Sequence, residues 1–307
     1  MNANAATAAP APAATLLRRA GPLDTMVALV RRELQEHRAL WIAPLVLAAL
    51  IALLLVLFGL RHIDIPQDLV TTEQKVAGLT IMQFMVAQML FGLSSIVVTV
   101  YLLDCLYAER KDRSILFWKS LPLSDELTVC SKLVVALVVV PLGTLLVAAA
   151  ADLVYVAIIA VRVPGAVSWS TYEWLRTELA LFVQVVIDLL WYAPIAAGLL
   201  LLSAWIPRNP LLWALLVPIV PPVVEWFSFG TRYIMRFELY RLKGIWPKLI
   251  NGPDQFANGQ HLPTVGAVFG RLNLGPVFTD VDLWLGVAAA AVMVYAAARI
   301  RRYRDDT

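Results

Sequence analysis

Apolar residues in this chain gather in runs of about 20, the length that a helix needs to cross a hydrocarbon core about 30 Å thick. The clearest run, residues 41–60, contains no charged residue. Because lipid offers no hydrogen-bond partners, the backbone of such a run must satisfy its own N–H and C=O groups, as a helix does. Hydrophobic residues make up 60% of the chain and charged residues 15%, whereas soluble domains have about 45–50% and about 25%. The sequence therefore predicts an all-α integral membrane protein.

Six segments have the length and composition of transmembrane helices. We predict them at about 41–60, 79–103, 131–160, 179–203, 211–229 and 281–298, within a six-helix transmembrane domain that covers residues 41–307. The fifth segment contains Pro218, Pro221 and Pro222, and proline removes a backbone donor and clashes with the preceding turn. We therefore expect its helix to be kinked or broken.

The residues before the first span divide into two parts. Residues 1–20 are rich in Ala and Pro and have no apolar period, which predicts a disordered tail. Residues 21–40 place Leu23, Val27 and Leu34 on one helical stripe and their basic residues mostly off it. This pattern predicts an amphipathic helix that lies along the membrane interface. The alternative is an ordinary basic segment beside the membrane.

The distribution of basic residues predicts the orientation. If both termini are cytosolic, 15 of the 25 Lys and Arg residues lie on the cytosolic side, as the positive-inside rule favours. We therefore expect a multi-pass protein of the cytoplasmic (inner) membrane with both termini inside. A re-entrant fifth segment is the alternative, and it would place residues 299–304 outside. The net charge of +3 is modest and does not point to nucleic-acid binding.

The loop after the second span, residues 104–132, carries the densest charge in the chain. Its middle contains Ile115, Leu116, Phe117 and Trp118, four apolar residues in a row that are costly to leave in water. A groove on a cytosolic partner would cover them, but aromatic residues also anchor loops at the lipid interface, so both interpretations stay open. Cys105 and Cys130 flank the loop, and reduced thiols are expected in the cytosol.

The loop resembles the first cytosolic loop of type-2 ABC transporter permeases. The resemblance rests on a Glu-Arg pair, a short apolar stretch, a Leu-Pro-Leu-Ser turn and a Ser-Lys pair at the next helix. These are Glu109, Arg110, Ser120, Leu121, Pro122, Leu123, Ser124, Ser131 and Lys132. The order of amphipathic segment, long second loop, short fourth loop and long fifth loop agrees with it over about residues 23–302. The resemblance implies the type-2 ABC exporter fold, with a connecting helix before the first span.

The resemblance also implies partners. The chain has no G-x-x-x-x-G-K-[ST] phosphate loop, so ATP and Mg²⁺ would bind a separate ATP-binding subunit, and this chain would be no enzyme and hold no cofactor. Two permease and two ATPase chains would assemble in membrane lipid and move substrate by alternating access, with export as the family tendency. A cytosolic coupling helix would contact the ATPase through Glu109, Arg110, Asp112, Arg113, Ile115, Leu116, Phe117, Trp118, Lys119 and Pro122.

Polar residues inside the spans are candidates for the transport pathway. Asp188 stands out, because a charged carboxylate at the bilayer centre costs about 2.5–3.5 kcal/mol on insertion scales. It could contact substrate or a cation, or form a structural hydrogen bond to another helix. The full candidate set is Gln83, Gln88, Ser94, Ser95, Thr99, Asp188 and Glu225. Small and polar residues also pack membrane helices together, so both roles stay open.

Two other classes of protein compete with this interpretation. An ion-gradient-driven secondary transporter would carry inverted repeats with matching broken helices, and only one span here contains a cluster of prolines. A membrane-embedded enzyme would need a catalytic motif or a metal site. The chain has neither H-E-x-x-H nor G-x-S-x-G, and we expect no carboxylate at metal-ligand spacing from His37, His62 or His261.

Overall fold

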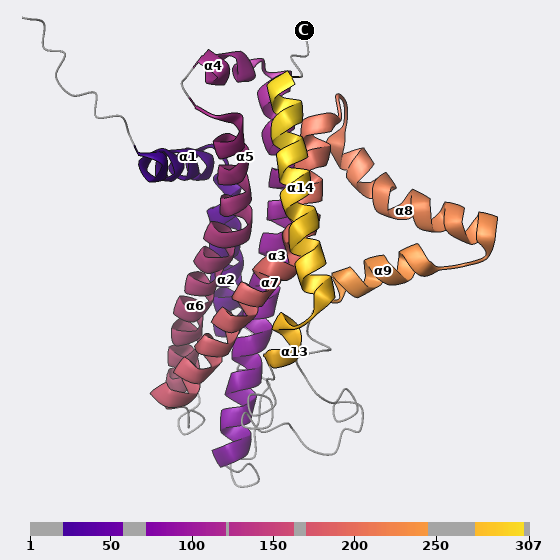
Figure 1. Cartoon of the computed structure of the whole chain (residues 1–307). Coiled ribbons are helices and arrows are strands. Elements are labelled where there is room, and N and C mark those ends of the chain that lie inside the picture. The colour runs from indigo at the N-terminus through magenta and orange to yellow at the C-terminus, as the bar shows by residue number, and fades with distance from the viewer. Residues whose placement is uncertain (1–20, 58–71, 121–122, 163–169, 245–273, 304–307) are drawn as a thin grey trace, which may run out of the picture.

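The computed structural model describes residues 21–57, 72–120, 123–162, 170–244 and 274–303, and every regular element in these ranges is helical (Figure 1). The elements are α1 (Pro22–Glu36), α2 (Ala39–Leu57), α3 (Thr72–Lys111), α4 (Ser114–Ser120), α5 (Asp125–Val134), the π-helical turn η1 (Val135–Val139), α6 (Val140–Arg162), α7 (Thr171–Trp205), α8 (Pro210–Phe229), α9 (Tyr233–Leu242), α13 (Gly275–Phe278) and α14 (Val281–Tyr303).

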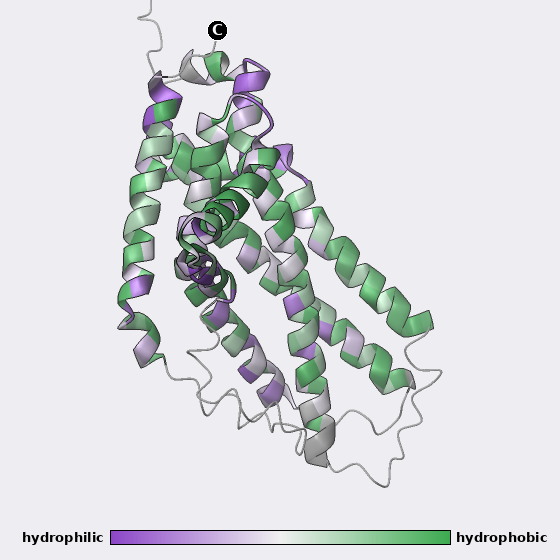
Figure 2. Ribbon diagram, turned by 90° about the vertical axis from the view of Figure 1, so that its right-hand side faces the viewer, coloured by the Kyte–Doolittle hydropathy of each residue, from purple (hydrophilic) through white to green (hydrophobic). Residues whose placement is uncertain are grey.

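Six helical segments in the described ranges are long and apolar enough to cross a membrane. They are Ala39–Leu57, Gly78–Lys111, Asp125–Val161, Thr171–Trp205, Pro210–Phe229 and Val281–Tyr303. The prediction of an all-helical, multi-pass membrane protein is thereby confirmed. Figure 2 shows apolar residues along most of each long helix and hydrophilic residues concentrated towards the helix ends. The predicted tail at residues 1–20 lies outside the described residues.

Several spans extend beyond their predicted ends, because a helix can continue into water while hydropathy detects only its apolar part. The second span continues to Lys111 in the structure. The third begins at Asp125, where the Ser124 hydroxyl accepts a hydrogen bond from the Leu127 N–H at 3.1 Å, as an N-cap does. Both extensions carry polar residues of the 104–132 loop into the end of the bundle.

The third span contains a wide turn, η1, between α5 and α6. The Val140 N–H donates to the Val135 carbonyl, five residues back, instead of the usual four. Pro141 follows directly and has no N–H to continue the α-helical pattern, and its ring would crowd the carbonyl four residues earlier. A single π turn accommodates such a residue without breaking the helix.

The bundle is built around α3 and α7, with α14 packed along α7 and α2 packed along α6. Ala193 and Ala197 of α7 face Ala290 of α14, and small side chains of this kind let two membrane helices approach closely. Figure 1 shows α4 and the last turn of α14 at the same end of the bundle, which we call the α4 end. A re-entrant fifth segment would have placed the last turn of α14 at the opposite end.

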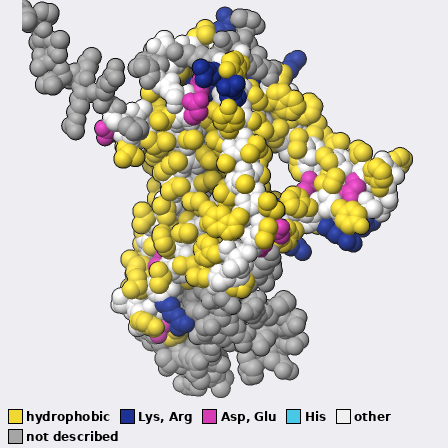
Figure 3. Space-filling model, viewed as in Figure 1, with side chains coloured by type: hydrophobic (Ala, Val, Ile, Leu, Met, Phe, Trp, Pro, Cys, Tyr) yellow, Lys and Arg dark blue, Asp and Glu magenta, His cyan; other side chains and the backbone are white. Residues whose placement is uncertain are grey.

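Helices α8 and α9 form a hairpin that projects sideways from the bundle (Figure 1). Of the kink or break expected at Pro218, Pro221 and Pro222, the break is wrong, because helix α8 is continuous from Pro210 to Phe229. Each proline deletes one backbone hydrogen bond but has a helical φ, and membrane helices tolerate such losses. Helix α8 is almost fully exposed, since only 6% of its most apolar stretch is buried. Figure 3 shows apolar side chains over much of the hairpin.

Candidate functional site

Four charged side chains from four helices meet in a buried cluster at the α4 end. Lys132 Nζ lies 2.7 Å from Glu33 Oε1 and 3.0 Å from Glu109 Oε1, and Arg301 Nη2 lies 3.1 Å from Glu109 Oε2. All four side chains are at most 7% exposed. We call Glu33, Glu109, Lys132 and Arg301 the ionic cluster. It joins α1, α3, α5 and α14, and Arg301 also contacts Asp125 at the start of α5.

Aromatic side chains close the α1 side of the ionic cluster. The Tyr101 hydroxyl donates to Glu33 Oε2 at 2.9 Å, and the His37 ring packs edge-on against Tyr101 with centroids 4.8 Å apart. His37 Nε2 lies 3.9 Å from Glu33 Oε2. Sequence analysis predicted the Glu-Arg and Ser-Lys pairs but did not anticipate that Lys132 pairs with α1, since no local pattern links residues 99 positions apart.

The α1 side also contains a cluster of three side chains that could bind a metal ion. It is the one such cluster among the described residues. Single ligand atoms of Glu33, Glu36 and His37 all lie within 4.8 Å of one another. The expectation that no carboxylate approaches His37 was therefore wrong. Glu33 already accepts from Lys132 and Tyr101, however, so its oxygens are occupied by donors. This group fits an ion-pair network better than a metal centre.

The predicted coupling residues divide into inward-facing and outward-facing groups. Glu109 belongs to the ionic cluster, and Arg110 Nη2 donates to the carbonyls of Ser203 at 2.6 Å and Ile206 at 2.8 Å, which ties α3 to the end of α7. Asp112 and Arg113 are exposed in the turn that follows. Arg113 has a φ of 56°, a left-handed conformation that ends α3 and redirects the chain into α4.

Among the described side chains of helix α4, Leu116 is the apolar one that faces outward. Ile115 is buried and Leu116 is 61% exposed. The Arg32 guanidinium carbon, Cζ, lies over the Trp118 ring, 3.4 Å from the ring centroid. This cation–π contact joins α4 to α1. The side chains of Phe117 and Lys119, and Pro122 as a whole, lie outside the described residues. Leu116 with Asp112 and Arg113 therefore forms the described outer surface of this loop.

Polar side chains in the bundle interior link α3 to α6 and α7. Gln88 Nε2 donates to Gln184 Oε1 at 2.9 Å, and Gln184 Nε2 lies 3.3 Å from Asp188 Oδ2. Ser94 and Thr144 share a buried hydrogen bond of 2.9 Å. Two predicted pathway residues, Gln88 and Ser94, thus lie in contacts between helices, whereas Asp188 bonds to Gln184 of its own helix.

A second polar group lies further from the α4 end. Gln83 Nε2 donates to Glu178 Oε1 at 2.9 Å, and Asp152 is 1% exposed beside both residues. Neither Asp152 nor Glu178 is among the pathway residues predicted from the sequence. Glu178 stands among charged residues at the start of α7, where the helix leaves the predicted apolar run, and nothing local shows that it turns inward.

Ser95 and Thr99 lie apart from these groups. The Ser95 hydroxyl donates to the Phe91 carbonyl and the Thr99 hydroxyl to the Ser95 carbonyl, both at 2.8 Å and both exposed. Hydroxyl side chains in membrane helices often bond to their own preceding turn in this way. The structure therefore does not bring these two candidates to Gln83, Gln88 and Ser94.

We expect Asp188→Asn to fold and insert like the wild-type chain. Asparagine keeps an acceptor oxygen for the Gln184 amide, so the free energy of unfolding should change by less than about 1 kcal/mol. Thermal unfolding in detergent measures this, with Asp188→Leu as the variant that removes the acceptor. Transport measured across a pH range then separates the two roles, since a purely structural Asp188 leaves the pH profile unchanged.

Glu225, also a pathway candidate, serves as a helix cap. Its carboxylate accepts from the Thr231 hydroxyl at 2.7 Å and from the backbone N–H groups of Tyr233 at 2.7 Å and Ile234 at 2.8 Å. These amides open α9, where an anionic acceptor satisfies unpaired donors and the helix dipole. The carboxylate thus fixes the corner between α8 and α9.

We expect Glu225→Ala to loosen the start of α9. Loss of a cap costs about 1–2 kcal/mol, so the Tyr233 and Ile234 amides should exchange hydrogen about 5–30-fold faster. Hydrogen exchange with mass spectrometry measures this change. Glu238→Ala, which alters a carboxylate in the middle of α9, is the matched control. Equal exchange in the two variants would contradict the capping role.

Comparison with known proteins finds no matching protein-family model, no similar curated protein and no similar solved structure. The function of the chain must therefore be judged from its spans, its ionic cluster and the surface of α4. These features describe a multi-pass membrane protein in which four helices meet in the ionic cluster, next to the α4 loop.

Proposed function

We propose that the chain is the permease subunit of an ATP-driven transporter of the type-2 ABC class, which moves substrate, by export as the family tendency, while a separate subunit hydrolyses ATP. The observation that carries this proposal is the placement of α4. It exposes Leu116 at the end of the bundle, and its Trp118 contacts α1 through Arg32. An exposed apolar side chain flanked by Asp112 and Arg113 suits a groove on a soluble partner.

The ionic cluster offers a route from this contact to the membrane spans. Glu109 and Lys132 flank the α4 loop in sequence, and through Glu33 and Arg301 they join α1 and α14. A push on α4 would therefore act on four helices at once rather than on a free loop. Such a rigid connection suits a two-state change between inward-open and outward-open forms. ATP and Mg²⁺ would bind the partner, and the complex would contain two copies of each chain.

Ion-gradient-driven secondary transport is the second candidate. Asp152, which is buried, and Glu178, which is half-buried beside it, favour this candidate, because intramembrane acids often mark ion pathways. The same residues could line the substrate path of an ATP-driven permease. The energy source therefore discriminates between the two candidates.

The test is reconstitution of the full chain in proteoliposomes with and without a candidate ATP-binding subunit. We expect the two proteins to co-elute from detergent extracts and the complex to hydrolyse ATP. Transport of a panel of amphiphilic compounds should then require ATP and survive collapse of ion gradients by ionophores. Transport that proceeds without ATP and stops with ionophores would replace this proposal with the second candidate.

A further inference from the structure

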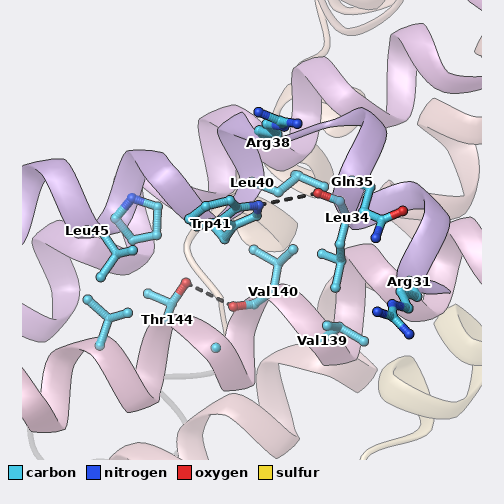
Figure 4. A pocket seen from close by; sticks show the side chains of 13 residues that line it. Arg31, Leu34, Gln35, Arg38, Leu40, Trp41, Leu45, Val139, Val140 and Thr144 are labelled. Carbon is cyan, nitrogen blue, oxygen red and sulfur yellow. Dashed lines mark hydrogen bonds between the residues drawn. The ribbon is translucent and has the colours of Figure 1, made fainter. Parts of the chain in front are cut away.

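A cavity of about 510 Å³ lies near the α4 end, between α1, α2 and the η1–α6 segment (Figure 4). Its volume is within the range of small-molecule sites, about 300–1,000 Å³. None of its lining residues belongs to the ionic cluster, and Thr144, which bonds to Ser94, is the one lining residue that it shares with the polar groups of the bundle interior described above. The cavity is therefore separate from the features that carry the proposed transport function.

The lining of the cavity is apolar along α2 and α6 and basic on α1 and at the junction of α1 and α2. Leu40, Trp41 and Leu45 face Val140 across the cavity, whereas Arg31 and Gln35 lie at its α1 side and Arg38 lies beyond Trp41, at the start of α2 (Figure 4). The Trp41 indole N–H donates to the Leu34 carbonyl at 3.3 Å, which holds the indole ring between the apolar and the basic lining residues. The cavity is thus itself amphipathic, with separate apolar and cationic walls.

The two arginines that line the cavity are not neutralised within the described part of the chain, since neither guanidinium of Arg31 or Arg38 forms an ion pair there. The neighbouring Arg32, in contrast, pairs with Glu36 at 2.8 Å. Two uncompensated guanidiniums beside an apolar cavity fit an anionic group attached to an apolar tail.

The position of α1 indicates the source of such a molecule. Figure 1 shows α1 lying across the bundle, and its Leu23 and Val27 are 80% and 66% exposed, as in a helix that lies in a membrane interface. Trp41 and Leu45 are half-exposed on α2, so the apolar wall of the cavity continues onto a surface that faces lipid. A phospholipid can therefore reach the cavity from the bilayer itself.

We propose that this cavity binds one anionic phospholipid, with its charged headgroup attracted by Arg31 on α1 and by Arg38 at the α1–α2 junction, and an acyl chain along Leu40, Leu45 and Val140. Binding would hold α1 against α2 and α6. Because α1 also contacts α4 through Arg32 and Trp118, the bound lipid would steady the surface of α4. The site depends on the local cavity and does not require that the chain transports anything.

The test uses the delipidated full chain in detergent, with bound lipid counted by native mass spectrometry. The probes are phosphatidylglycerol and phosphatidylcholine with identical acyl chains, and inorganic phosphate. We expect one phosphatidylglycerol to bind at least about tenfold more tightly than phosphatidylcholine. Arg31→Ala/Arg38→Ala should weaken phosphatidylglycerol about 30-fold, about fivefold for each arginine, and leave phosphatidylcholine unchanged. Arg208→Ala, an exposed arginine outside the cavity, is the charge control.

A second variant tests the apolar wall. Gly143 lines the cavity, and a Cβ at this position has no heavy atom within 4 Å, so Gly143→Leu adds apolar volume at the cavity wall. It should weaken both lipids, whereas Gly92→Leu, equally unobstructed but outside the cavity, should weaken neither. Equal affinity for the two lipids, an unchanged double arginine variant, an unchanged Gly143→Leu or displacement of lipid by inorganic phosphate would each overturn the proposal.

Discussion

Lys132→Met is expected to be among the most destabilising substitutions in the chain. The lysine is 1% exposed and lies between Glu33 and Glu109, so its loss leaves two buried carboxylates short of a cation. Breaking a buried ion pair by removing one partner costs about 3–5 kcal/mol. Thermal unfolding in detergent and the yield of folded protein in membranes measure this effect.

A second substitution distinguishes unpaired charge from lost packing. Glu33→Gln in the Lys132→Met background removes the carboxylate that loses its closest cation, and replacement of whole buried pairs is often close to neutral. The double variant should therefore recover most of the lost stability. Arg208→Met is the matched control, because it removes an exposed basic residue. A double variant no more stable than Lys132→Met would show that the lysine acts through packing instead.

Leu116→Asp should strongly weaken binding of the proposed ATP-binding subunit without affecting the fold. Leu116 is 61% exposed, so aspartate at this position is solvated in the free chain, but it would be buried unpaired in an apolar groove on a partner. A central interface residue contributes about 2–4 kcal/mol, which corresponds to an affinity about 30–1,000-fold weaker. Co-elution and ATP-dependent transport measure the effect, with thermal unfolding as the test of folding.

Trp118→Asp is a second test of the α4 surface, and Tyr303→Asp is its control. Trp118 contacts Arg32 of α1, so Trp118→Asp should uncouple ATP turnover from transport while expression and insertion stay intact. Tyr303 is 65% exposed at the same end of the bundle, and Tyr303→Asp should leave binding unchanged. If Leu116→Asp binds and transports like the wild type, α4 is not the contact with the ATPase.

The predictions for Lys132 and Leu116 concern the inner and the outer side of the α4 region. Leu116 faces outward from α4, whereas Glu109 and Lys132, on the helices that flank the α4 loop, face inward. The π turn η1 begins three residues after Lys132, where an α-helix would be stiffer. A movement of α4 would therefore be transmitted through the ionic cluster to the third span, which contains the π turn η1.

Local features of the sequence were sufficient to predict the spans and some of their ends. Hydropathy located all six membrane helices, and α5 begins at a serine, Ser124, a residue type that is favoured at helix N-caps. Such features depend on residues within a few positions of one another, so each segment carries its own signal. The prolines of α8 were misjudged for the same reason, because a local rule does not include the tolerance of a membrane helix for lost hydrogen bonds.

The sequence by itself determined that this chain crosses a membrane, since a run of about 20 apolar residues has no other low-energy arrangement for its backbone. Only the tertiary structure decided which polar residues meet. Arg301 reaches Glu109 across 192 positions and Gln88 reaches Gln184 across 96. These contacts follow from how α3 packs against α7 and α14, and the face that each helix turns inward is set by its neighbours rather than by its own composition.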